Sequence, residues 1–137
     1  MPFKKSIVII FITVFASIIC ASASANITGT YSCRGTDLTQ NPSNFTQKMV
    51  ITQQGDTYQI FETNAAGVLS PYQQFGIRTG DVLSIAFQST ESKTFGVQVY
   101  KIKDKGKKLI GPFIYEDKFN LQGIETCEKI SDNMSLK

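Results

Sequence analysis

The chain has 137 residues with a formal net charge of +3, and it contains no His. Its length suits one domain of ordinary size, and its weak charge lacks the single-sign field that drives binding to nucleic acid or anionic membranes. The absence of His excludes Ser-His-Asp triads, His-ligated metals and the commonest general base of enzymes.

The first 25 residues have the features of a cleavable signal peptide. Lys4 and Lys5 form a basic start, residues 7–19 are almost wholly apolar, and residues 21–25 read Ala-Ser-Ala-Ser-Ala, a small-residue cleavage site. The apolar run is shorter than the roughly 20 residues that span a bilayer core. We therefore expect residues 1–25 to be removed and the mature chain to be secreted or periplasmic, without an integral membrane segment. Without Lys4 and Lys5, that mature chain is nearly neutral.

Cysteine usage agrees with an exported domain. Cys20 follows Ile19, where a lipidation signal carries a small residue, so we expect Cys20 to leave with the signal peptide and not to anchor a lipoprotein. Cys33 and Cys127 remain, an even number in an oxidising compartment, and we predict a disulfide between them. Metal binding by the pair is the alternative, which the lack of His disfavours. No cofactor is expected.

The mature chain predicts an all-β domain over residues 26–130. No window shows an apolar repeat at helical spacing, and short turns containing Gly or Asp make neighbouring strands antiparallel. We predict an eight-stranded antiparallel meander, closed or nearly closed as an up-and-down barrel, followed by a flexible C-terminal tail at residues 131–137. The runs rich in Val, Ile, Thr, Tyr and Phe that predict the strands are Thr28–Arg34, Phe45–Thr52, Thr57–Thr63, Tyr72–Arg78, Val82–Phe87, Thr94–Ile102, Leu109–Tyr115 and Leu121–Ile130.

Alternation along the strands assigns side chains to the interior. In a closed sheet the first and eighth strands become neighbours, so a Cys33–Cys127 bridge would join them, which favours a barrel over a sandwich. The run 94–102 is apolar on both faces, and its orientation stays open. The residues assigned inward are Tyr31, Cys33, Phe45, Met49, Ile51, Tyr58, Ile60, Leu83, Ile85, Phe87, Leu109 and Phe113.

Two resemblances follow from these segments. Asn26-Ile27-Thr28-Gly29-Thr30-Tyr31 resembles the first strand of avidin-like and lipocalin-like barrels, although the chain has no Trp and biotin binding is not implied. The wider pattern resembles a poorly characterised group of bacterial exported β-proteins, some of them labelled fibronectin-binding. The chain departs from that group at Glu62 and Phe113, where Trp is usual. The segments that carry the wider resemblance are Gly29–Tyr31, Val50–Tyr58, Gly76–Leu83, Gly96–Tyr100, Leu109–Phe113 and Gly123–Glu125.

Glu62 and Glu125 fall on faces otherwise assigned to the interior. A buried carboxylate is costly unless it is paired, so each acid needs an Arg, a Lys or several hydrogen-bond donors, and Arg34 or Arg78 are candidate partners. The two acids could form structural ion pairs, bind a ligand, or act as the carboxylate pair of a glycosidase. Tyrosines offer an apolar body with a polar tip, so Tyr58, Tyr72, Tyr100 and Tyr115 either pack in the core or line a pocket. The candidate ligand-binding residues are Tyr58, Glu62, Tyr72, Arg78, Tyr100 and Glu125.

We therefore expect a non-catalytic exported binding module. Eight strands enclose room for side chains or one small ligand, so its partner is a small molecule in the barrel or an extracellular or envelope protein on the loops, and not nucleic acid. The alternative is a barrel that inhibits a protease or lysozyme with a protruding loop, and the third hypothesis is a carboxylate-dependent hydrolase.

A cluster of lysines near the C-terminal third of the chain predicts the solvent-exposed tip of a hairpin. Phosphate or glycan binding is the alternative function for this cluster. Its members are Lys101, Lys103, Lys105, Lys107 and Lys108.

Overall fold

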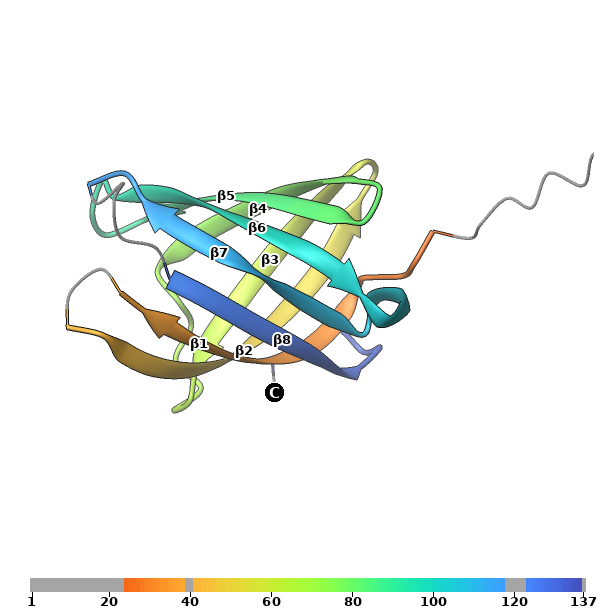
Figure 1. Cartoon of the computed structure of the whole chain (residues 1–137), viewed down its shortest axis with the longest axis horizontal. Helices are drawn as coiled ribbons and strands as arrows, with labels where there is room; N and C mark the ends of the chain where they lie inside the picture. Colours follow the sequence, from red (N-terminus) through yellow and green to blue (C-terminus); the bar gives the residue numbers. More distant parts are fainter. Residues whose placement is uncertain (1–23, 39–40, 118–122, 137) are drawn as a thin grey trace, which may run out of the picture.

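The computed structural model describes residues 24–38, 41–117 and 123–136, so the predicted signal peptide through Ala23, with Cys20, lies outside the described residues. The chain forms a closed barrel in which eight antiparallel strands follow one another in chain order (Figure 1). The predicted meander and its closure are thus confirmed. The strands are β1 (Gly29–Asp37), β2 (Ser43–Gln54), β3 (Thr57–Asn64), β4 (Tyr72–Thr79), β5 (Val82–Ser89), β6 (Phe95–Lys103), β7 (Lys108–Tyr115) and β8 (Gly123–Ser131).

Tight turns join the strands at one end of the barrel. Gly55 and Gly80 have φ values of 60° and 61° in the β2–β3 and β4–β5 turns, a conformation that glycine adopts without steric cost. The β6–β7 connection is a short 3₁₀ turn, η1 (Asp104–Gly106), and it carries the predicted lysine tip, where Lys105 and Lys107 are exposed. No helix among the described residues is long and apolar enough to cross a bilayer.

The seam of the barrel carries the predicted disulfide. β1 pairs with β8, and Cys33 lies directly opposite Cys127 in that ladder. The two sulfurs are bonded at 2.05 Å across a sequence separation of 94 residues. The prediction that Cys33 and Cys127 join the first and last strands is therefore confirmed.

The apolar core fills the half of the barrel nearest the tight turns. Ile27 and Gly106 close this end: the Tyr31 hydroxyl lies 2.9 Å from the Ile27 carbonyl oxygen and 2.8 Å from that of Gly106. This closed half is filled by fully buried side chains, because inward residues of neighbouring strands meet at the same height there. Its members include Tyr31, Met49, Ile51, Ile60, Leu83, Ile85, Tyr100 and Leu109.

The orientation of β6 is set by its neighbour. Residues directly opposite each other in an antiparallel pair share a face, and Tyr100 pairs with the buried Leu83. Gln98, Tyr100 and Ile102 therefore point inward, whereas Val97 and Val99 lie on the outer surface.

The described part of the C-terminal segment lies against β1. The hydroxyl of Thr30, which is buried, donates to the carbonyl oxygen of Asn133 and accepts from the backbone N–H of Ser135 at 3.4 Å. These bonds satisfy a buried hydroxyl that would otherwise lose its hydrogen-bond partners on leaving water. The segment predicted to be a flexible tail thus makes specific contacts at residues 133–135.

Candidate functional site

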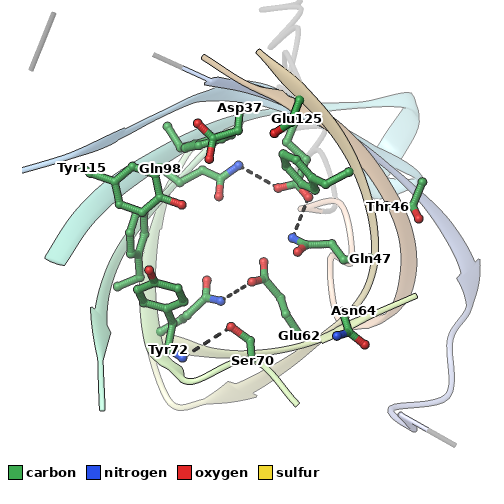
Figure 2. Close-up of a pocket in the computed structure, with 15 residues that line it drawn as sticks. Asp37, Thr46, Gln47, Glu62, Asn64, Ser70, Tyr72, Gln98, Tyr115 and Glu125 are labelled. Atoms are coloured by element: carbon green, nitrogen blue, oxygen red, sulfur yellow. Dashed lines mark hydrogen bonds between the residues drawn. The ribbon is translucent and has the colours of Figure 1, made fainter. Parts of the chain in front are cut away.

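The other half of the barrel is open and holds a cavity of about 280 Å³. Polar side chains of five strands form its floor and aromatic rings form its wall (Figure 2). The volume is just below the range for small-molecule sites, about 300–1,000 Å³. Every strand contributes at least one of the lining residues, which are Asp37, Ser43, Phe45, Thr46, Gln47, Glu62, Asn64, Ser70, Tyr72, Gln74, Phe87, Gln98, Phe113, Tyr115 and Glu125.

Glu125 lies deepest in the floor and is held by three donors. Gln47 Nε2 donates to its Oε1 at 2.7 Å, and Gln98 Nε2 donates to its Oε2 at 3.0 Å. The Tyr100 hydroxyl, from the core below, also donates to Oε2. Burial raises the pKa of Glu125, while the hydrogen bonds from Tyr100, Gln98 and Gln47 oppose that rise. With an exposed fraction of 1 %, this carboxyl group is a structural part of the floor.

Glu62 is the carboxyl group that reaches into the cavity. Figure 2 shows its oxygens directed toward the centre of the opening, and Gln74 Nε2 donates to Oε2 at 2.6 Å. Burial, followed by the neighbouring charge of Glu125, raises the pKa of Glu62 to about 8, although hydrogen bonds from Gln74 and Gln47 oppose this. Glu62 therefore holds a proton over most of the neutral pH range.

Three phenylalanine rings of the wall lie over glycines of the neighbouring strand. Phe45 pairs with Gly35, and Phe87 and Phe113 pair in the same way with Gly96 and Gly123. A Cβ atom at any of these glycines would overlap the opposite ring. The missing side chains thus let each ring lie against the barrel wall, which leaves the middle of this half open.

The rings also contact one another in a continuous series. Phe45 and Phe113 have centroids 6.0 Å apart, Phe113 and Tyr115 5.8 Å, Tyr115 and Phe87 5.5 Å, and Phe87 and Tyr72 5.5 Å. All four contacts are edge-to-face, the geometry that aromatic quadrupoles prefer. Together Phe45, Tyr72, Phe87, Phe113 and Tyr115 make up what we call the aromatic wall.

The structure brings only some of the predicted site residues together. Glu62, Tyr72 and Glu125 line the cavity, and Tyr100 supports it from beneath. Tyr58 is buried in the core of the closed half. Arg78 donates from Nε to the Gly80 carbonyl oxygen at 2.7 Å and from a second nitrogen to Ala25 at the closed end.

The expected arginine partners of the two acids are therefore replaced by amides. Arg34 is exposed on the outer side of β1 and lines a separate surface hollow, while Arg78 lies at the opposite end of the barrel. The hypothesis of an Arg–Glu ion pair is wrong for these residues because both arginines lie away from the floor. Gln47, Gln74 and Gln98 stabilise the acids instead.

These three glutamines were missed by the sequence interpretation. Gln47 occurs at inward parity, two residues from Met49, whereas the sequence leaves open the inward faces of residues 72–78 and 94–102, which carry Gln74 and Gln98. A polar residue on an inward face is the same signal that singled out Glu62 and Glu125. Applied to amides as well as acids, it would have found Gln47, but not Gln74 or Gln98.

One grouping of metal-ligand types occurs beside the floor. Ligand atoms of Cys33, Glu125 and Cys127 lie within 4.8 Å of one another among the described residues. Both sulfurs are bonded to each other, so neither is available as the thiolate that a metal would require. The grouping marks the disulfide at the base of the cavity.

Comparison with known proteins extends only to the fold. No family model and no curated protein match the chain. Among solved structures, a redesigned β-barrel superposes with a TM-score of 0.61 and 10 % identity, covering 75 % of this chain and 90 % of that one. A Phe-171-Ala mutant of transferrin binding protein B from Actinobacillus pleuropneumoniae superposes with a TM-score of 0.52 and 11 % identity. The match covers 74 % of this chain and 60 % of that protein, so it extends over less than two thirds of the latter.

Proposed function

We propose that this protein is an exported, non-catalytic binding module that holds a small molecule in the open half of its barrel. The observation that carries the proposal is the cavity itself: about 280 Å³ of space above a hydrogen-bonded polar floor and inside an aromatic wall. Polar groups that converge beside aromatic rings in one hollow are typical of small-molecule sites, and this cavity is lined by polar side chains and five aromatic rings. The open end also favours this hypothesis over an inhibitor that presents a loop on a filled core.

Export is the second part of the proposal. The signal-peptide pattern of residues 1–25 supports it, and a disulfide is typical of proteins outside the reducing cytoplasm. N-terminal sequencing of the secreted protein tests it. We expect a start at Ser24 or Asn26, whereas a lipid-modified Cys20 would contradict a freely soluble product.

The arrangement of the carboxyl groups supports binding over hydrolysis. A glycosidase needs two carboxyl groups that both reach the scissile bond. Glu125 is 1 % exposed and engaged by Gln47, Gln98 and Tyr100, so it is badly placed as a nucleophile or base. Glu62, which is buried but lines the cavity, remains as a polar group that a ligand in the cavity could contact.

The test is to close the cavity without disturbing the barrel. Ser43 is exposed and lines the cavity mouth, while its neighbour Asn44 lies outside the cavity and hydrogen-bonds Thr36. We would measure thermal shifts for wild type, Ser43→Trp and the matched control Asn44→Trp with sugars, amino acids, organic cations, carboxylic acids and short lipids. We expect at least one class to raise the Tm of wild type and Asn44→Trp but not of Ser43→Trp. A panel without any stabilising compound, or stabilisation that survives Ser43→Trp, would contradict a ligand in the barrel.

A further inference from the structure

The charges around the cavity are of one sign. Three of its lining residues are acidic: Asp37 at the rim, Glu62 in the middle and Glu125 in the floor. Within the described part of the chain, none of the lining residues is Lys or Arg. Opposite charges are absent from this lining, so the field inside the cavity becomes negative as its carboxyl groups ionise, and low-dielectric surroundings strengthen it.

The aromatic wall suits the same sign of ligand. The face of an aromatic ring is the negative part of its quadrupole, and it attracts cations within about 6 Å of the ring centroid. Phe45, Phe87 and Phe113 lie over glycines, so their rings cover the wall and do not project across the opening. A ligand in the cavity is therefore surrounded by ring surfaces on one side and meets Glu62 on the other.

From this juxtaposition we propose that the ligand is a small organic cation, with its ammonium or guanidinium group against Glu62 and its apolar part within the aromatic wall. The inference rests on the proposed function, because it specifies the ligand class of the same cavity. Above about pH 8, where Glu62 ionises, a neutral sugar or an anion would leave the charge of Glu62 without a counter-charge. A cation supplies the charge that the described lining lacks.

Binding a cation at this place is coupled to the loss of a proton. Burial and Glu125 hold the pKa of Glu62 at about 8, so at neutral pH the cation displaces one proton from Glu62 to solvent. The titratable groups that face Glu62 are Asp37 on β1, Tyr72 on β4, Tyr100 on β6, Tyr115 on β7 and Glu125 on β8. The pKa values of all three tyrosines are raised, so none of these hydroxyl groups ionises near neutrality.

The experiment compares a cation with its neutral isostere. Choline and 3,3-dimethyl-1-butanol differ by one nitrogen in place of carbon, and the charge of choline does not titrate. We would measure both Kd values by calorimetry with the disulfide-bonded protein between about pH 6 and pH 9. Above about pH 8, where Glu62 is ionised, we expect choline to bind at least tenfold more tightly than the alcohol. Its Kd should fall roughly tenfold per pH unit up to about pH 8 and then level, with release of one proton.

Three variants locate the effect. Glu62→Gln keeps the shape and should lower choline affinity at least tenfold at pH 8 while abolishing the pH dependence, without affecting the alcohol. Glu91→Gln removes an exposed acid from the β5–β6 turn outside the cavity, and should bind like wild type. Tyr72→Leu should weaken choline more than the alcohol, because leucine keeps an apolar contact but removes one ring face.

The possible failures are distinguishable. Equal binding of choline and the alcohol, or choline binding that Glu62→Gln leaves unchanged, would overturn the cation assignment. If Ser43→Trp weakens the binding of either ligand, or of a neutral monosaccharide tested in parallel, the cavity remains a binding site and only its ligand class is wrong. If Ser43→Trp weakens the binding of none of the compounds, the proposed function itself fails.

Discussion

The two halves of the barrel interior are built from the same strands but packed by opposite rules. In the closed half, Met49, Leu83 and Leu109 are fully buried and fill the space between strands. In the open half, amides and carboxyl groups form the floor and phenylalanine rings lie back over glycines. The first arrangement maximises burial of apolar surface. The second keeps a space open at the expense of that burial, which is typical of functional sites.

The boundary between the halves is reinforced by the disulfide, and its loss has the largest expected effect. Replacing both Cys33 and Cys127 with Ser removes a crosslink across 94 residues. The chain-entropy model gives a destabilisation of about 4–5 kcal/mol. Urea unfolding of the double variant and wild type measures it. A change below about 1 kcal/mol would show that β1 and β8 are held together without the crosslink.

A truncation in each half would sharpen the comparison. Leu83→Ala leaves a void in the closed half, with an expected loss of about 3 kcal/mol. Tyr72→Leu enlarges a space that is already open, so we expect a loss of only about 1 kcal/mol or less. Chemical denaturation gives both free energies of unfolding. Equal losses would mean that the open half packs as a second core.

The pH dependence of stability gives a small expected change in the free energy of unfolding for each unit of pH. The pKa of Glu62 is raised from 4.5 to about 8 on folding, so the folded state binds more protons than the unfolded state between these values. Its contribution to stability is therefore greatest below about pH 4.5 and is lost as the pH rises toward 8, on the order of 1 kcal/mol per pH unit. Denaturant midpoints at several pH values measure this slope. Glu62→Gln should flatten it and be more stable than wild type near pH 9.

Glu125→Gln provides the matched comparison for that variant. Gln47 donates to one oxygen of Glu125, and Gln98 and the Tyr100 hydroxyl donate to the other. The new amide NH₂ would replace one of these oxygens and face the donors on that side. Unpaired donors cost about 1–3 kcal/mol, so we expect this variant to lose stability at neutral pH. A gain in both variants would show that neither acid has a structural role.

Several features of the site follow from sequence alone because they depend on local rules. Period-two alternation identifies which side chains point inward, including Glu62 and Glu125, whose burial the structure confirms. Strand direction in a meander adds more: Glu62 is near the end of β3 and Tyr72 at the start of β4, so both belong to one end of the barrel. Tyr58 and Arg78 lie at the other ends of the same strands, and that reasoning would have removed them from the candidate site.

The sequence by itself determined the eight strands, the inward faces of all of them except β4 and β6, and the pairing of Cys33 with Cys127, because turns, alternation and cysteine number are signals readable without the fold. Only the tertiary structure decided which inward residues lie at the same level along the barrel axis. That depends on the stagger between strands around the closed barrel, set by every hairpin register together. The stagger brings Gln47, Gln98 and Glu125 together from strands far apart in the sequence. It also places Phe45, Phe87 and Phe113 over glycines, so rings expected to fill a core surround a cavity.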